Sequence, residues 1–435
     1  MEDARQRSVD AVETLSDDLV QFTRDMVRIP TETHPPSGDE GPGQDHLARY
    51  LGDTFGWDVD CFLPTDVPGI EEHPGWWPGL EYTNRPNVVA RRSGAGGGRS
   101  IVLNGHIDVV PAGPAELWTH LPYGGEIADG RIYGRGSVDM KGGIAAMIYA
   151  VRAIEHAGIR LAGDVVVESV VNEEMGGYNG TLACCLRGYE GDAAVVTEGT
   201  LCRIMPAHKG GQGLRLRVPG KSAHANMWWR GVSALDKAIY LKNTLAEFQR
   251  EREEETRDNP YFSDPSLFPV SALVDTVWSL HAGSPDVMAS PEEALLDFWV
   301  DALPGEQLDQ IIDRLERRLE MAADEDPFLR ECRPVLERHA IMRPFYPTAV
   351  PLDHPIVGTL ASACQSVTGE RPGIFGMSAV CDAMMFNLHS STPAVIFGPG
   401  DVGIAHSPDE YVEIDELVRA AKILAATIVS WCGVA

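Results

Sequence analysis

We predict an α/β fold: a mixed, mostly parallel sheet flanked by helices, carrying an inserted, smaller ferredoxin-like α+β domain. Two observations carry this prediction. Apolar runs at 101–103, 164–171 and 193–196 alternate with amphipathic helical patterns, which is typical of parallel strands covered by helices. Between residues 207 and 342 the pattern changes to β-α-β-β-α-β, the order of a ferredoxin-like layer.

The length of 435 residues favours more than one domain. We assign 1–206 and 343–435 to the larger domain and 207–342 to the smaller one. In the larger domain we expect helices at 8–28, 44–55, 144–156, 354–368 and 413–431, and strands at 57–62, 87–91, 101–103, 164–171, 193–196, 372–375 and 394–397. In the smaller domain we expect strands at 213–218, 270–278, 294–303 and 335–340, and helices at 231–250 and 305–321.

Composition excludes several classes of partner. The chain has 36 Lys and Arg against 64 Asp and Glu, a net charge of −28, which argues against nucleic acid and anionic membranes. No stretch approaches the roughly eighteen apolar residues of a membrane span, and the charged N-terminus does not resemble a signal peptide. The eight scattered cysteines include no Cys-x-x-Cys pair, which predicts reduced, buried thiols and a cytoplasmic location.

Acids and histidines follow the apolar strands of the larger domain. His106 and Asp108 follow 101–103, the pair Glu173-Glu174 follows 164–171, and Glu198 follows 193–196. Asp139 lies in the Gly-rich loop that opens the helix at 144–156, and His406 follows the strand at 394–397. Because ligands bind at the carboxyl ends of strands in an open α/β sheet, we expect these side chains to converge there.

The converging residue types suit a metal centre. Its candidate ligands are His106, Asp139, Glu174, Glu198 and His406. Imidazoles and carboxylates bind zinc, cobalt or manganese. Five ligands exceed one tetrahedral zinc and suit two metals about 3.5–4 Å apart, bridged by a carboxylate and a water. Taken singly, each residue has an ordinary structural explanation, such as helix capping by Asp139. The prediction rests on their occurring together.

Six sequence blocks resemble a known family. The blocks NGHIDVVP, YGRGSVDMKGG, NEEMGG, TEGT, GKSAHA and IAHSPDEY are similar to those of the dinuclear zinc metallopeptidases and deacylases. That family includes acetylornithine deacetylase, succinyl-diaminopimelate desuccinylase, aminoacylase and carboxypeptidase G. The resemblance runs from about residue 15 to the C-terminus, in order. It is specific for the fold and metal site, and much less so for the substrate.

The resemblance implies a ligand assignment. His106, Asp139 and Glu198 would bind one metal, and Asp139 would bridge to a second metal completed by Glu174 and His406. It therefore implies two divalent ions per chain. Zinc is the first choice, and cobalt or manganese would also suit the ligands.

The resemblance also implies three catalytic roles. Asp108 would orient His106, as metal-bound histidines usually require. Glu173 would be the general base and later the acid that protonates the leaving amine. His224 of the smaller domain would stabilise the oxyanion in the partner subunit's site; without the motif match, a plain loop histidine would be the preferred interpretation. The smaller domain would then serve as lid and dimerisation domain of a homodimer.

The sequence departs from the family on the smaller domain's third strand. Many relatives carry Asn-x-x-Pro and then Asp-x-Arg there, which help to bind a substrate carboxylate. Here residues 288–291 read Met-Ala-Ser-Pro, and residues 297–301 read Asp-Phe-Trp-Val-Asp. Arg230 and Arg343 remain as candidates for binding a substrate anion. The pair Trp228-Trp229 would either wall an acyl pocket or pack the lid or dimer.

We therefore predict a metal-dependent amide hydrolase. It would remove an acetyl, formyl or similar acyl group from an amino-acid-like amine, using a metal-bridged water and Glu173 as base. The stretches THPPSGDE and YTNRPNVVA resemble deacylases related to acetylornithine deacetylase, some of which act on N-formyl compounds. A dipeptidase or carboxypeptidase of the same family is the first alternative. A non-catalytic binding protein is the second, and loss of a ligand or base would have favoured it.

Overall fold

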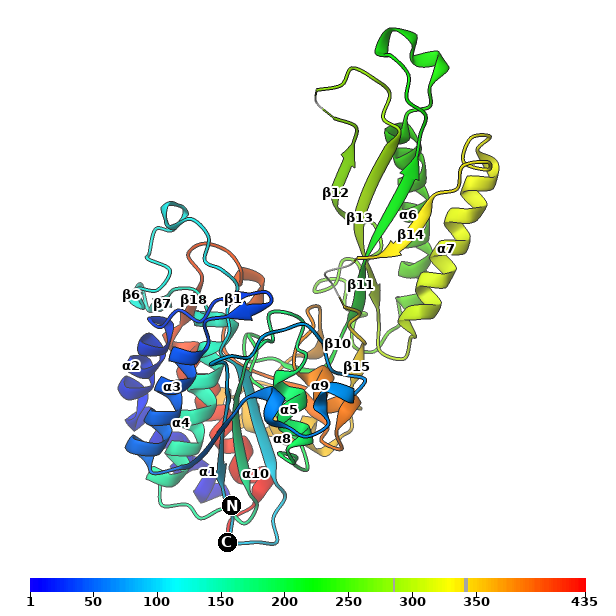
Figure 1. The fold of residues 1–435 in the computed structure, drawn as a ribbon. Coiled ribbons are helices and arrows are strands. Elements are labelled where there is room, and N and C mark those ends of the chain that lie inside the picture. The colour runs from blue at the N-terminus through cyan, green and yellow to red at the C-terminus, as the bar shows by residue number, and fades with distance from the viewer. Residues whose placement is uncertain (285, 340–342) are drawn as a thin grey trace. The chain divides into compact units, whose positions relative to one another are not determined.

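A computed structural model describes residues 1–284, 286–339 and 343–435. The chain forms two compact units (Figure 1). The larger unit comprises Met1–Ala207 and Ala349–Ala435, and the smaller unit comprises His208–Thr348.

The larger unit is built on a mixed sheet of nine strands among the described residues, in the order β15-β10-β17-β9-β5-β8-β4-β3, with β16 paired to β10. These strands are β3 Asp58–Phe62, β4 Asn87–Arg92, β5 Ile101–His106, β8 Val165–Val170, β9 Ala194–Val196, β10 Ile204–His208, β15 Thr348–Ala349, β16 Ile374–Met377 and β17 Ala394–Ile396. The central strands β17, β9, β5 and β8 run parallel. The strands β4 and β10 pair antiparallel with β8 and β17, and β3 pairs antiparallel with β4. The predicted fold class is confirmed.

Helices lie on both sides of this sheet (Figure 1). They are α1 Glu2–Thr14, α2 Ser16–Val27, α3 Gly41–Arg49, α4 Gly142–His156, α5 Gly180–Leu186, α8 Pro355–Thr368, α9 Ala383–His389 and α10 Ile414–Cys432. Every residue of β5 and β8 is buried, which explains their continuous apolar runs. Each fully buried Val, Leu or Ile contributes roughly 1.5–3 kcal/mol to this core. The helices and strands thus hold the carboxyl edge of the parallel strands in place.

The N-terminal prediction of one helix over 8–28 is wrong, because the chain forms two helices, α1 and α2. The break falls at Leu15, where ψ is 8° and the backbone leaves the helical region. The backbone N–H of Leu15 is shared between the carbonyls of Ala11 and Val12, at 3.1 Å each, which closes the first helix. The apolar stripe continues across the break, so periodicity alone did not reveal it.

A small three-stranded sheet was not predicted. It contains β6 Glu126–Ala128, β7 Arg131–Tyr133 and β18 Tyr411–Glu413, in the order β18-β7-β6. These strands are too short for a period-two pattern to stand out. The sheet matters for the site, because β7 leads into the loop of Asp139 and β18 follows the loop of His406. It thereby ties together two segments that are distant in sequence.

The smaller unit has the predicted β-α-β-β-α-β order. Its elements are β11 Gly210–Pro219, α6 Ala234–Thr256, β12 Thr276–Ala282, β13 Glu293–Ala302, α7 Leu308–Glu325 and β14 Val335–Arg338. The sheet has the order β12-β13-β11-β14 and is antiparallel throughout. Its core contains Leu216, Phe298, Leu241 and Leu315, which join the sheet to α6 and α7.

The strand predicted at 270–278 begins later, at Thr276. The backbone N–H groups of Val274 and Asp275 donate to Gln249 Oε1 on α6, at 2.5 and 3.2 Å, so this stretch binds the helix instead of the sheet. The last strand agrees through Arg338, and residue 340 lies outside the described residues.

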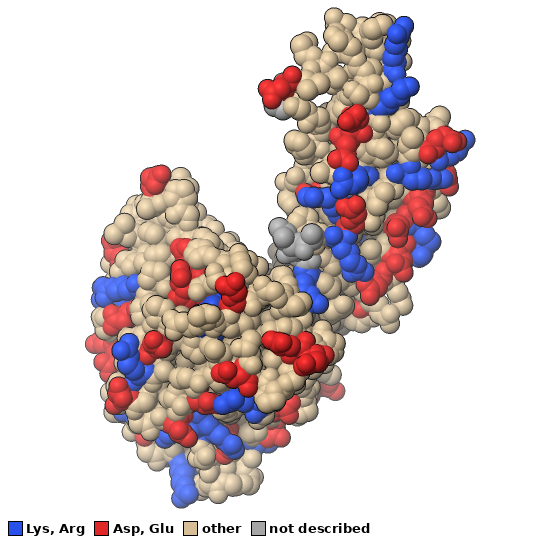
Figure 2. Space-filling view, viewed as in Figure 1, with Lys and Arg blue, Asp and Glu red and all other residues tan. Residues whose placement is uncertain are grey.

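The cysteines and the surface charge were also predicted. All eight cysteines are free, but Cys61 and Cys332 are exposed, so the prediction of uniformly buried thiols is wrong for these two. Among the described residues, no helix combines the length and apolar character needed to cross a membrane. On the face shown in Figure 2, basic side chains lie between the acidic ones.

Candidate metal centre

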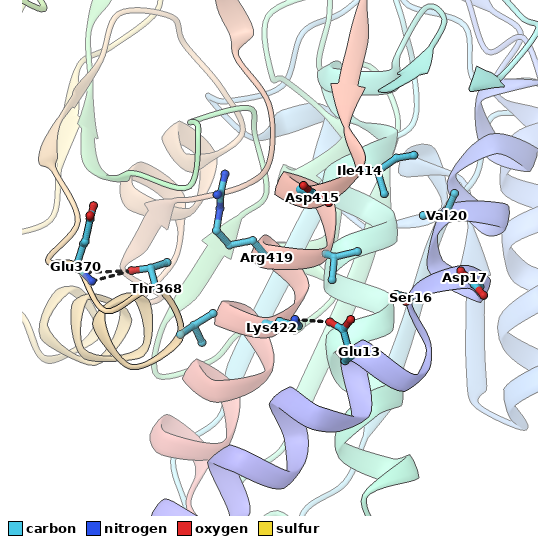
Figure 3. A pocket seen from close by; sticks show the side chains of 12 residues that line it. Glu13, Ser16, Asp17, Val20, Thr368, Glu370, Ile414, Asp415, Arg419 and Lys422 are labelled. Carbon is cyan, nitrogen blue, oxygen red and sulfur yellow. Dashed lines mark hydrogen bonds and ion pairs between the residues drawn. The ribbon is translucent and has the colours of Figure 1, made fainter. Parts of the chain in front are cut away.

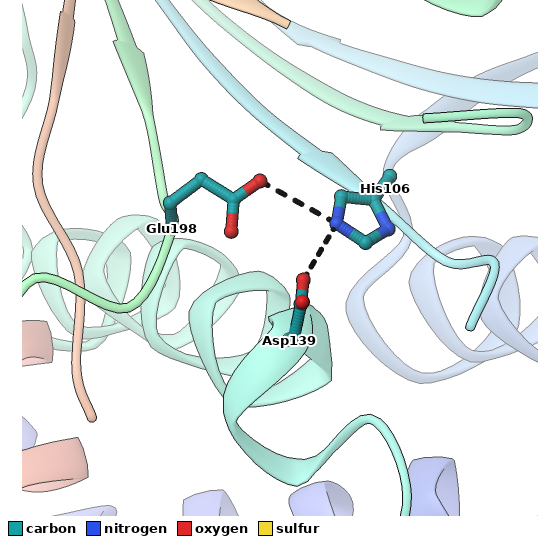
Figure 4. A group of neighbouring side chains, drawn as sticks. All are labelled: His106, Asp139 and Glu198. Carbon is teal, nitrogen blue, oxygen red and sulfur yellow. Dashed lines mark hydrogen bonds and ion pairs between the residues drawn. The ribbon is translucent and has the colours of Figure 1, made fainter. Parts of the chain in front are cut away.

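Three predicted ligands meet at the carboxyl end of β5 and β9 (Figure 4). His106 is the last residue of β5, Glu198 follows β9, and Asp139 lies in the turn Ser137–Lys141 before α4. His106 Nε2 lies 3.0 Å from Asp139 Oδ1 and 3.4 Å from Glu198 Oε1. One ligand atom from each residue lies within 4.8 Å of the others. A single divalent cation could contact all three.

A second group shares Asp139 with the first. His406 Nε2 lies 3.2 Å from Asp139 Oδ2 and 3.0 Å from Glu174 Oε2. The other oxygen of Glu174, Oε1, accepts the backbone N–H of Val110 at 3.2 Å. The structure therefore brings together all five predicted ligands, in two groups joined by the carboxylate of Asp139. This arrangement suits two cations bridged by one carboxylate.

Two residues that sequence reasoning missed hold Asp139 in place. Glu410 Oε1 accepts the backbone N–H groups of Val138 and Asp139, at 3.1 and 3.3 Å. Its other oxygen binds Arg135 Nη1 at 2.5 Å, in a pair buried from solvent. Glu410 lies four residues after His406, so this contact joins the two ligand loops. Both residues lie inside the quoted sequence blocks, which was the available signal.

His106 is oriented by a backbone group. Its Nδ1 lies 2.9 Å from the backbone oxygen of Asp108, which therefore accepts the Nδ1–H. The Nε2 lone pair is then directed at the ligand group. The carboxylate of Asp108 is 3.7 Å from Nδ1, and it accepts the backbone N–H groups of Glu173 and Glu174 at 3.1 and 3.0 Å. Asp108 thus contacts the imidazole through its carbonyl, whereas its side chain shapes the neighbouring turn.

Glu173 lies beside the ligands without belonging to either group. Its Oε2 is 3.8 Å from His106 Nε2, and the residue is 8% exposed. Burial, together with the nearby acids, raises the pKa of the Glu173 carboxyl well above its usual value. A buried carboxyl next to a metal centre is the arrangement that a general base requires.

The ligands strongly perturb one another's protonation. Hydrogen bonds to Asp139 and Glu174 raise the pKa of His406 to about 10. Burial and the charge of Asp139 raise the pKa of Glu174 to about 7. Burial opposes the charging of His106, but Asp139 and Glu198 outweigh it and hold the His106 pKa well above the usual value. Strong mutual shifts of this kind are typical of functional clusters.

The remaining predicted site residues belong to the smaller unit. His224 is exposed, and its Nδ1 accepts the backbone N–H of Asn226 at 3.2 Å. Arg230 is exposed, and Arg343 is half-buried. Trp228 and Trp229 are 70% and 63% exposed, so they are not part of this unit's own core.

The acids that depart from the family pattern have partners within the smaller unit. Asp297 forms a bidentate salt bridge with Arg215, whose Nε and Nη2 donate to the two carboxylate oxygens at 2.7 and 3.0 Å. Asp301 binds Lys209 Nζ at 3.1 Å and accepts Trp299 Nε1–H at 2.7 Å. These acids therefore serve the packing of this sheet.

A separate surface groove lies on the larger unit (Figure 3). Its lining residues are Glu13, Ser16, Asp17, Val20, Val367, Thr368, Glu370, Ile414, Asp415, Val418, Arg419 and Lys422. They differ from the predicted site residues, and Lys422 is paired with Glu13 at 2.5 Å. The groove therefore adds no group to the candidate metal centre.

Comparison with known proteins defines the class. Residues 102–430 match the family described as Peptidase family M20/M25/M40, and the chain belongs to this family. The chain is 30% identical to N-formyl-4-amino-5-aminomethyl-2-methylpyrimidine deformylase of Bacillus subtilis (strain 168), over 97% of this chain and 96% of the relative. It is 25% identical to a probable succinyl-diaminopimelate desuccinylase of Staphylococcus aureus (strain MSSA476), over 93% of this chain and 95% of that protein.

A solved structure has the same fold. The M20 family metallo-carboxypeptidase Sso-CP2 of Sulfolobus solfataricus matches with a TM-score of 0.70 and 16% identity, over 94% of this chain and 98% of that one. The predicted family and the predicted enzyme class, a metal-dependent amide hydrolase, are confirmed.

Proposed function

We propose that this enzyme removes a formyl or similarly small acyl group from the nitrogen of an aminomethyl-heteroaromatic amine. One observation carries the proposal: the 30% identity to a pyrimidine deformylase extends over 97% of the chain. The close grouping of the candidate metal ligands supports it. The products would be the free amine and a small carboxylate such as formate.

The residues present fit two divalent cations. His106, Asp139 and Glu198 would hold one, and Asp139, Glu174 and His406 the other. Nitrogen and carboxylate donors with no thiolate suit zinc first, with cobalt or manganese as alternatives. When bound, such a pair polarises an acyl carbonyl and lowers the pKa of water.

The chain's own groups would perform the proton transfers. Glu173 would accept the proton of the attacking water and then deliver it to the departing nitrogen. Asp108 would keep Glu173 in place, because its carboxylate binds the backbone of that turn. Because Glu173 is buried, the proton that it carries would not exchange readily with bulk water.

We further propose that the smaller unit is the lid and dimerisation domain of a cytoplasmic homodimer. Its edge strand β12 exposes Trp278 and Leu280, at 45% and 43%, and the following loop exposes Met288 at 78%. Large exposed apolar side chains on an open sheet edge favour pairing with a second copy. The free cysteines fit a reducing compartment.

His224 would stabilise the oxyanion from the lid. We expect His224→Ala to lower kcat by roughly 10²–10³-fold, because removal of one oxyanion donor has that effect. Metal content and dimer mass should stay unchanged, as measured by elemental analysis and sedimentation. His156→Ala, which alters an exposed histidine at the end of α4, is the control. An unchanged kcat in His224→Ala would remove the proposed role.

A substrate panel tests the proposed activity. N-formyl, N-acetyl, N-succinyl and N-carbamoyl derivatives of an aminomethylpyrimidine and of amino acids would be assayed beside dipeptides, with zinc, cobalt or manganese. We expect chelator-sensitive amine release that is fastest from the N-formyl aminomethylpyrimidine. Faster cleavage of dipeptides would instead establish the peptidase alternative. If no substrate of the panel is hydrolysed and the chain binds no metal, the binding-protein alternative would be favoured.

A further inference from the structure

The turn that carries Glu173 and Glu174 is bound by side chains from two directions. Asn87, at the start of β4, accepts the backbone N–H of Val171 through Oδ1 at 3.1 Å. The carboxylate of Asp108 accepts the backbone N–H groups of Glu173 and Glu174. The residue between these two anchor points is Asn172.

Asn172 lies in a conformation that needs support. Its φ is +73°, in the left-handed region, and it is fully buried. A non-glycine residue is uncommon in this region and is held there by its surroundings. Its side-chain oxygen accepts a hydrogen bond from Arg85 Nη2 at 3.3 Å. This contact supports the position just before the predicted base.

All three guanidinium nitrogens of Arg85 donate hydrogen bonds. Its Nε and Nη2 donate to the two oxygens of Glu40, at 2.7 and 2.5 Å, and its Nη1 donates to the backbone oxygen of Glu81 at 2.8 Å. Arg85 is 1% exposed and Glu40 is 0% exposed. The planar guanidinium can bind Glu40 with two donors and still reach Asn172, which the point charge of a lysine cannot do.

We propose that Arg85 is a positioning residue for the reaction, because its guanidinium, locked by Glu40, holds Asn172 and so sets the direction of the Glu173 and Glu174 carboxylates. The proposal rests on the proposed function, since it takes Glu173 as the base. A buried ion pair is weak grounds for stability by itself, so its contact with the catalytic turn is the informative feature. The competing account is that the pair only stabilises the fold.

Two variants break the contact from opposite sides. Arg85→Lys removes the guanidinium Nη2 donor that binds Asn172. Asn172→Gly removes the acceptor but leaves the Arg85–Glu40 pair intact, and glycine adopts a φ of +73° without strain. We expect each variant to lower kcat by about 10-fold to 100-fold with little change in KM, because small misplacements of catalytic groups have effects of that size. Arg91→Lys, which alters an exposed pair with Asp164 at the end of β4, is the matched control and should keep wild-type kcat.

A metal titration gives a readout that does not depend on turnover. Because Glu174 belongs to one ligand group only, cobalt(II) titration of the metal-stripped chain should show one equivalent weakened in Arg85→Lys and Asn172→Gly. The equivalent held by His106 and Glu198 should keep its affinity. Equal weakening of both equivalents would indicate general destabilisation and would overturn the proposal.

The double variant supplies the decisive comparison. Since both substitutions break the same contact, Arg85→Lys/Asn172→Gly should lose no more kcat than the worse single variant. Multiplied losses would overturn the proposal, as would wild-type kcat in Asn172→Gly. Failure of the proposed function is distinguishable, because it would show as an inactive wild-type chain in the substrate panel, and the cobalt titration would still test Arg85.

Discussion

The acids of the candidate metal centre and the acids of the smaller unit have different partners. In the smaller unit, buried and half-buried acids meet Lys or Arg, in the pairs Asp297–Arg215, Asp301–Lys209 and Glu306–Arg252. In the larger unit, Asp139, Glu174 and Glu198 converge on imidazole Nε2 atoms. A Lys or Arg side chain neutralises the charge of a buried acid within the fold. Acids that lie beside shared imidazoles can instead bind a divalent ion. The kind of partner therefore separates the candidate metal ligands from these acids of the smaller unit.

The largest effect should follow from removal of the shared carboxylate. We expect Asp139→Asn to reduce bound metal from about two ions per chain to one or fewer and kcat by about 10³-fold or more, since metals supply several kcal/mol of transition-state stabilisation. Elemental analysis and steady-state kinetics measure both. Asp129→Asn, at an exposed turn, should change neither. Retention of two metals by Asp139→Asn would refute the shared-ligand assignment.

The next effect separates the base from the ligands. Glu173→Gln should lower kcat by roughly 10²–10⁴-fold, the usual contribution of a general base, while both metals stay bound. Turnover near that of the wild type would show that Glu173 is not the base. The exposed Glu116→Gln variant controls for the charge change.

In the smaller unit, breaking a pair should affect stability and leave metal binding intact. Lys209→Met leaves Asp301 buried without its cation, and such a loss costs roughly 3–5 kcal/mol. Hydrogen exchange of β13 amides in the full chain should accelerate accordingly. Lys209→Met/Asp301→Asn should recover part of the loss, because no unpaired charge remains. Loss of bound metal in Lys209→Met would contradict the separation of roles.

The smallest effect concerns a buried histidine of the smaller unit. Burial lowers the pKa of His208 to about 4, and its Nε2 accepts a hydrogen bond from Thr348 at 2.9 Å. The unfolded chain takes up this proton near pH 6.5, so stability should fall by about 3 kcal/mol as the pH drops from 6.5 to 4. Hydrogen exchange of β11 amides across this range measures it. His208→Gln should flatten the profile, and an unchanged slope would exclude His208 as the cause.

Part of the site could be predicted because its residues occupy regular positions. His106, Glu174 and Glu198 follow buried strands, and the carboxyl ends of parallel strands meet at one edge. The supports could not be predicted in the same way. Glu410 reaches Asp139 across 271 residues, and Arg85 reaches Asn172 across 87, through loops with no periodic pattern.

The sequence by itself determined the two-part α/β architecture and the ligand set, because period, burial and ligand chemistry are local properties of the residues. Only the tertiary structure decided how each group is used. It showed that the Asp108 carbonyl orients His106 while its carboxylate holds the Glu173 turn. It also showed that Asp301 completes a pair with Lys209. Such choices depend on which polar groups are buried together, since each buried donor or acceptor must find a partner among its neighbours in space.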